Sequence, residues 1–137
     1  MALRFATRRA QHTGGLVTLI CVARQGDVQQ WRGVEEIMRD EAHQEAESAL
    51  HGAAKIVNEL SGLLPELVIE HGDTAECVMH LIKSDKDISI LVLGAGISKD
   101  GPGPLVSLVV GPQAGGYPIP VTIVPGRLSN AEIDALA

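Results

Sequence analysis

Short apolar segments alternate along this chain with longer segments that carry apolar residues at helical spacing. Four of the short segments are predicted strands, at residues 16–23, 66–70, 88–93 and 120–125. The first, Leu16 to Ala23, is apolar on both faces, which is typical of a parallel strand buried between helices. The alternation therefore predicts an α/β fold with a parallel sheet and right-handed crossover connections.

Helical periodicity marks the segments between these strands. The longest is 34–60, where apolar residues recur every three or four positions and glutamates occupy the opposite face. Asp73–Glu76 and Ser129–Glu132 have the spacing of capping boxes, so each is expected to begin a helix. We expect further helices at residues 2–12 and 105–110. The whole pattern indicates one α/β domain over residues 1–126 and a short helical tail over 127–137.

Composition narrows the class of partner. Lys and Arg number 11 and Asp and Glu 17, so the 137-residue chain has a formal net charge of −6. An acidic chain lacks the positive field that attracts a phosphate backbone. Its only aromatic residues are Phe5, Trp31 and Tyr117, too few to form a platform for stacked bases. We therefore expect no nucleic-acid partner.

The same sequence gives no sign of a membrane or secretory protein. Its longest strongly apolar stretch, Leu16 to Ala23, is far shorter than the roughly 18 residues that indicate a membrane span. Two cysteines, Cys21 and Cys77, cannot make a disulfide framework and are expected as free thiols. We expect a cytoplasmic protein that binds no membrane.

A glycine-rich loop follows the third predicted strand, at Gly94 to Gly103. Ligands of open parallel sheets bind beyond the carboxyl ends of the strands, and glycines let the backbone approach a phosphate. The loop could therefore cradle a nucleotide phosphate, or it could be a tight surface loop in which Gly and Pro only form turns. It contains neither a Walker sequence nor a dinucleotide fingerprint.

Other groupings of reactive side chains are incomplete. Cys77 and His80 lie three residues apart, with His71 and Asp73 just upstream, but a zinc site needs four ligands at recognisable spacing. The alternative is a thiol in the core with ordinary histidines around it. Because no nucleophile can be paired with a base, we assign no catalytic residue. Because the set of ligands is incomplete, we assign no metal site.

Several segments resemble the universal stress protein family. They are Ala2–Ala6, Thr13–Leu19, the Leu91–Gly94 junction between strand and loop, and Pro118–Pro125 near the end. The resemblance extends to about Gly126. It implies a doubly wound parallel sheet of the adenine nucleotide α-hydrolase-like kind. It also implies a dimer formed through the last strand, with Val121 and Ile123 at the dimer edge.

Many members of that family bind ATP through a glycine motif, which this chain matches only in part. Gly94 and Gly96 are separated by one residue instead of two, and Ser107 matches while Val106 stands in place of a glycine. If nucleotide binding is retained, the resemblance assigns it to Gly94, Gly96, Ser98 and Ser107, with ATP or AMP as the ligand.

The resemblance also implies a strand before the first helix, in the centre of a five-stranded sheet. This sequence begins at the helix instead, and Met1 stands where a helix-capping residue is expected. We therefore expect a chain truncated at its N-terminus, with four of the five strands present and the first, central strand missing.

Three functions follow from these observations. The leading hypothesis is a non-catalytic stress-response regulator that acts as a homodimer. The alternative is a sensor that binds ATP or AMP at the Gly94–Ser107 loop. A slow nucleotide hydrolase ranks last, because the sequence offers no acid placed to hold a metal.

Overall fold

The computed structural model describes residues 1–23 and 32–137, with side chains described for 1–23 and 37–137. Helices and strands alternate along the chain, as predicted. The elements are α1 (Ala2–Thr13), β1 (Thr18–Ala23), α2 (Arg32–Ser61), β2 (Glu66–His71), α3 (Thr74–Ser84), β3 (Leu91–Ala95), α4 (Pro104–Val109), the short 3₁₀ helix η1 (Ala114–Gly116), β4 (Val121–Pro125) and α5 (Asn130–Leu136).

The strands pair in parallel, which confirms the predicted strand direction. β1 pairs with β2 from Thr18 opposite Glu66 to Ala23 opposite His71. β3 pairs with β4 from Leu91 opposite Val121 to Ala95 opposite Pro125. The four described strands form two separate two-stranded sheets, which fits the expected doubly wound sheet with its central strand missing. The division falls between β1 and β3, which is where the resemblance expected a central strand.

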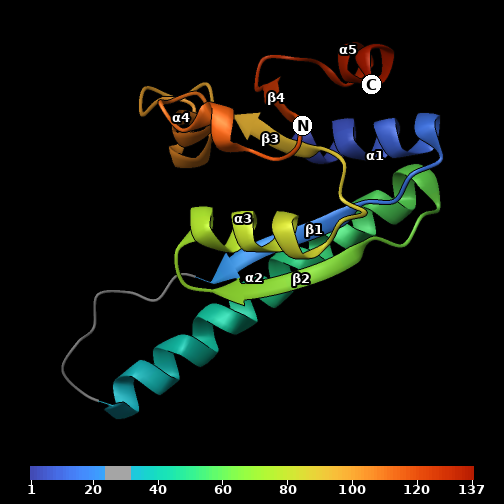
Figure 1. The fold of residues 1–137 in the computed structure, drawn as a ribbon. Coiled ribbons are helices and arrows are strands. Elements are labelled where there is room, and N and C mark those ends of the chain that lie inside the picture. Colours follow the sequence, from blue (N-terminus) through green and yellow to red (C-terminus); the bar gives the residue numbers. More distant parts are fainter. Residues whose placement is uncertain (24–31) are drawn as a thin grey trace.

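Helices cover both faces of the strands and connect the two sheets (Figure 1). α2 and α3 pack on the first sheet, and α4 packs on β3 and α3. α1 contacts α2 in one half of the molecule and β3 and β4 in the other. The helix α1 therefore holds the two sheets together, and α5 in turn packs on α1.

Local sequence signals explain the ends of the helices. No side chain caps α1 at Met1, as the sequence predicted, and Gly14 ends that helix with a φ of 73° that suits glycine. At the start of α3, the Asp73 carboxylate accepts a hydrogen bond from the Glu76 N–H at 3.0 Å. The predicted capping box at Ser129 is complete, because both of its reciprocal bonds with Glu132 are present.

The third strand begins later than the sequence predicted. Leu91 is its first paired residue, with its N–H donating to the Pro120 carbonyl at 3.0 Å. Ile88 instead donates to the Asp85 carbonyl in a turn, so residues 88–90 lie outside the sheet. Pairing continues to Ala95, because the Gly126 N–H donates to the Ala95 carbonyl at 2.9 Å. Apolar β-branched residues thus extend beyond the strand that they predicted.

The buried core is built mainly from small aliphatic side chains. Ile133 and Val57 are completely inaccessible to solvent, and Thr7 is buried with its hydroxyl donating to the Leu3 carbonyl at 2.7 Å. Ile133 comes from α5, so the C-terminal helix contributes to the core. Among the described residues, no helix combines the length and the apolar character that crossing a membrane requires.

Candidate functional site

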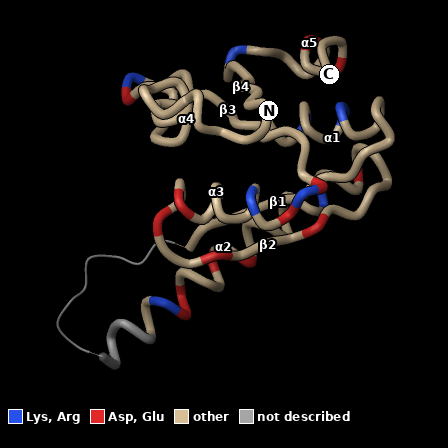
Figure 2. Tube along the Cα trace, in the orientation of Figure 1, with Lys and Arg blue, Asp and Glu red and all other residues tan. Residues whose placement is uncertain are grey.

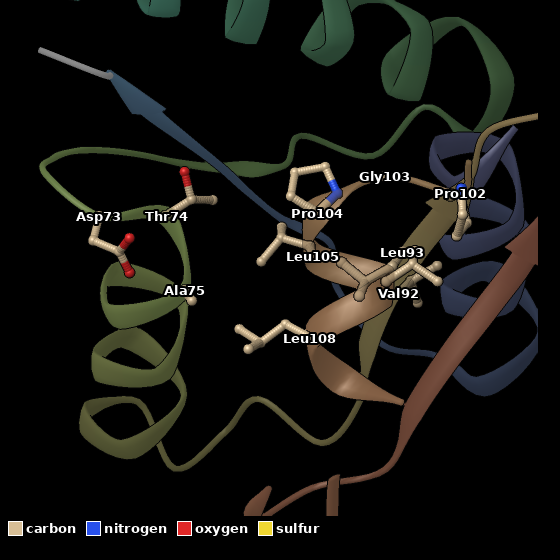
Figure 3. A pocket seen from close by; sticks show the side chains of 12 residues that line it. Asp73, Thr74, Ala75, Val92, Leu93, Pro102, Gly103, Pro104, Leu105 and Leu108 are labelled. Carbon is tan, nitrogen blue, oxygen red and sulfur yellow. The ribbon is translucent and has the colours of Figure 1, made fainter. Parts of the chain in front are cut away.

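A cavity of about 500 Å³ lies between the start of α3, the strand β3 and the helix α4 (Figure 3). Leu105 and Leu108 extend from α4 toward α3 across this space. Val92, Leu93 and Gly94 line it from β3. The cavity thus lies where the two halves of the molecule meet. Its wall is formed by α3 on the side of the first sheet and by β3 and α4 on the side of the second.

The chemistry of the cavity wall is aliphatic with a single acid. Asp73 is the only ionisable side chain among the described residues that line it. Its carboxylate already accepts the hydrogen bond from Glu76 N–H and so occupies the positive end of α3. α4 carries no charged residue, whereas acidic residues lie along α2 and around β2 (Figure 2). A phosphate in this cavity would meet a like charge and no lining cation.

The four residues assigned to a nucleotide do not come together around this cavity. Only Gly94 lines it, and Gly96, Ser98 and Ser107 do not. The loop is closed on itself, because Gly96 N–H donates to the Pro102 carbonyl and Gly101 N–H to the Ser98 carbonyl, both at 3.1 Å. These two amides are therefore already used within the loop.

Val106 stands where the family motif has a glycine, and the structure shows where its side chain goes. It is 6% exposed and belongs to the core, while the neighbouring Ser107 is exposed. Pro104 is the first residue of α4 and has no N–H to offer. The helix has six residues, and the Ser107 N–H donates to the Gly103 carbonyl. The side chain of Val106 thus packs against the protein, and Pro104 offers no donor.

The last strand presents a free edge with a defined register. The β3–β4 hydrogen bonds at Pro120 and Gly126 show that the even-numbered residues of β4 face β3. Val121 and Ile123 therefore direct their N–H and C=O groups to the opposite edge, along which no described strand pairs. Both are half-buried. These are the two residues that the family resemblance assigned to a dimer edge.

The tail helix is fixed to α1 by a cluster of charged groups. The Arg4 guanidinium donates through Nε and Nη2 to the two carboxylate oxygens of Asp134, both at 2.7 Å. Arg8 Nε donates to the same carboxylate at 3.1 Å, and Arg8 Nη1 donates to the Leu60 carbonyl at 3.0 Å. Hydrogen bonds from Arg4 lower the pKa of Asp134 to about 2.

Sequence reasoning missed this cluster and assigned no role to Asp134. A signal was present, because Arg4 and Arg8 are four residues apart and so lie on one face of the helix. The sequence could not show which acid meets them.

A second contact between side chains joins two histidines, one from α2 and one from β2, and a cysteine of α3 hydrogen-bonds to the second histidine. His43 Nδ1 and His71 Nε2 are 3.0 Å apart, and the rings stack with centroids 5.1 Å apart. Cys77 Sγ donates to the His71 carbonyl, and desolvation by burial raises the pKa of that thiol. Cys21 and Cys77 are both free, as predicted, although both are half-buried. Over the described parts of the chain, no three potential metal ligands converge.

Parallel strand pairs, helices on both faces and a glycine loop after β3 define a doubly wound α/β protein. No family model and no curated protein matches this chain. Its structure is similar to that of the universal stress protein UspA from Lactobacillus plantarum, with a TM-score of 0.72 and 19% sequence identity. The similarity covers 90% of this chain and 86% of that one. The chain therefore has the universal stress protein fold that its sequence predicted.

Proposed function

We propose that this protein is a universal stress protein-like regulator of the cytoplasm that is non-catalytic and acts as a homodimer without depending on a nucleotide. The observation that carries the proposal is the chemistry of the cavity beside β3. Its wall is aliphatic, and its one lining acid already caps α3. A protein with this surface is better suited to contacts with polypeptides than to holding phosphates.

The loop after β3 supports the same conclusion. A nucleotide phosphate is bound by several free backbone N–H groups, usually with a nearby cation. Here Gly96 and Gly101 donate within the loop, and Pro102 and Pro104 have no N–H. These four positions therefore offer no free N–H to a phosphate.

Thermal unfolding with ATP, ADP and AMP tests this part of the proposal. A site filled at one hundred times its Kd would stabilise the folded state by about 2.7 kcal/mol. We expect no nucleotide-dependent rise in Tm. A rise that Gly94→Ala and Ser107→Ala abolish would overturn the proposal and establish the ATP or AMP sensor instead.

The free edge of β4 supports the dimer. No strand among the described residues pairs along the edge that carries Val121 and Ile123, and such an edge is a surface to which another strand can add. Edge-to-edge pairing of two copies would satisfy the N–H and C=O groups of both residues.

Sedimentation velocity on the wild type and two proline variants tests the dimer. Ile123→Pro removes an N–H that faces the free edge, so we expect a folded monomer. Thr122→Pro removes an N–H that faces β3, so this matched variant should lose stability in the subunit itself. A wild type that sediments as a monomer at micromolar concentration would contradict the dimer.

A further inference from the structure

One side of α1 contacts the tail helix through three side chains spaced four residues apart. Arg4 and Arg8 both donate to the Asp134 carboxylate, through bonds of 2.7 to 3.1 Å. The ring Nδ1 of His12 lies 2.8 Å from the Ala137 backbone oxygen. Residues at this spacing lie on the same side of a helix, so the three side chains define the tail-binding face of α1.

The tail-binding face is held in place by parts of the protein other than the tail. Arg8 Nη1 donates to the Leu60 carbonyl at 3.0 Å and to the Gln11 side chain at 2.9 Å. These two bonds involve only α2 and α1, so they orient the Arg8 guanidinium without help from α5. Thr7 is completely buried, so α1 itself is anchored in the core. The face is therefore formed independently of the helix that it binds.

The helix bound there is short and amphipathic (Figure 1). Ile133 of α5 is completely buried and Asp134 meets the arginines, while Leu136 is 63% exposed. The seven residues of α5 are fewer than the roughly 12 that an isolated helix needs in water, so α5 is stable only while it is bound. The structure thus defines the ligand of this face, which is a short helix that presents an isoleucine followed by an aspartate.

Few other contacts hold the tail helix. Among the described elements, α5 packs chiefly on α1. Water reaches the charged cluster, because the side chains of Arg4, Arg8 and Asp134 are 22%, 24% and 36% exposed. Release of α5 therefore costs one buried isoleucine and a partly exposed ion cluster, and it breaks no strand pairing. Units of this kind open well before the rest of a domain unfolds.

Both the tail and the face that binds it lie beside the last strand. α1 contacts β4, and α5 follows β4 after a turn in which the Leu128 N–H donates to the Pro125 carbonyl. Antiparallel pairing of two β4 edges about a two-fold axis leaves both α1 helices on the same face of the joined sheet. Neighbouring strands are about 4.8 Å apart. Each tail in such a dimer therefore begins about one strand spacing from the β4 of the other copy, against which the other α1 packs.

We propose that the tail-binding face of α1 binds the α5 helix of a second copy, so that the two subunits of the dimer exchange their tails. Each subunit supplies the arginines of one face and receives the isoleucine and the aspartate of the other tail. The same contacts form between chains as within one chain, so the exchange requires no new surface. The inference rests on the proposed dimer, which holds both tails near both faces.

A peptide with the sequence of residues 127–137 tests the face in the full chain. The receptor is the Asp134→Asn variant, whose own tail is weakened while Ile133 keeps its place in the core. The control peptide carries the same Asp134→Asn change, which preserves length and shape but removes the carboxylate. We expect the natural peptide to bind at least about tenfold more tightly than the control. Adding Arg4→Gln to the receptor should abolish that difference.

Two complementary full-length variants test the exchange between copies. Arg4→Gln is labelled with ¹⁵N and keeps an intact tail, whereas unlabelled Asp134→Asn keeps an intact face. The labelled tail can then bind fully only to the other chain. We expect mixing to slow amide exchange at Ile133 and Ala137 of the labelled chain by at least about tenfold, because both N–H groups donate within α5. An unlabelled chain with both substitutions is the control and should give no protection.

Sedimentation velocity on the same samples separates the two proposals. A dimer whose labelled tail gains no protection on mixing would overturn the exchange and leave the dimer standing. A chain that sediments as a monomer would overturn both. Equal binding of the natural and control peptides would show that the face does not recognise the carboxylate, and it would also overturn the exchange.

Discussion

Arg4 and Asp134 are 130 positions apart in the sequence and share two parallel hydrogen bonds of 2.7 Å. This bidentate contact joins the first helix to the last, and Arg8 adds a third bond to the same carboxylate. Because α1 contacts α2 in one half of the molecule and β3 and β4 in the other, the contact fixes the C-terminal helix to the part of the molecule that connects the two halves.

The first prediction concerns acid stability. The pKa of Asp134 in the folded protein is about 2, below its ordinary value of 3.8. The carboxylate therefore binds its proton more readily in the unfolded chain, and its stabilising effect is complete above about pH 4 and lost as pH falls toward 2. We expect Asp134→Asn to reduce this acid dependence in urea unfolding, with Asp100→Asn as an exposed control. Equal pH dependence in both variants would contradict the assignment.

The second prediction concerns the tail helix as part of the core. Ile133 is completely buried and Leu136, on the same helix, is 63% exposed. We expect Ile133→Ala to lower the free energy of unfolding by about 3 kcal/mol, since it leaves a cavity. Leu136→Ala should cost less than about 0.5 kcal/mol. Denaturant unfolding would disprove the docking of α5 if the two variants lost equal stability.

A third prediction separates packing from nucleotide binding at position 106. Val106→Gly restores the glycine of the family motif, but it also removes a buried side chain from a helix. We expect a loss of about 3 kcal/mol in unfolding free energy and no binding of ATP. Ser107→Gly, exposed on the same helix, should lose only about 1 kcal/mol. ATP binding gained by Val106→Gly, measured by calorimetry, would show that valine alone blocks a site.

The fourth prediction concerns the acid in the cavity. Asp73→Ala should cost about 1 kcal/mol, because the Glu76 N–H loses its cap. Asp73→Ser keeps a capping oxygen and removes the negative charge, so we expect nearly wild-type stability by thermal unfolding. If Asp73→Ser were as unstable as Asp73→Ala, the carboxylate would stabilise the protein by something other than capping.

Features that depend on neighbouring residues were predictable from the sequence. The capping box at Ser129, the uncapped start of α1 and the glycine that ends it all formed as expected, and Asp73 caps α3 through one of the two bonds of a capping box. Each rests on a hydrogen bond or a backbone angle within a few residues. The start of β3 was misplaced because Ile88 and its neighbours have strand-like side chains, while pairing depends on the distant Pro120.

The candidate site was less predictable. Gly94 lies at the cavity, but Thr74, Leu105 and Leu108 line it with no marking in the sequence. The stacking of His43 on His71 likewise depends on how α2 lies against β2. In each case the residues come from different elements, and the sequence does not give the relative positions of elements.

The sequence by itself determined the alternation of strands and helices, their parallel pairing and the acidic, aromatic-poor surface, because these follow from periodicity, capping and composition. Only the tertiary structure decided that the described strands divide into two pairs, with no described strand between β1 and β3. It also decided that Asp134 meets Arg4. Both depend on the distance between groups far apart in the chain, which packing sets and local sequence does not.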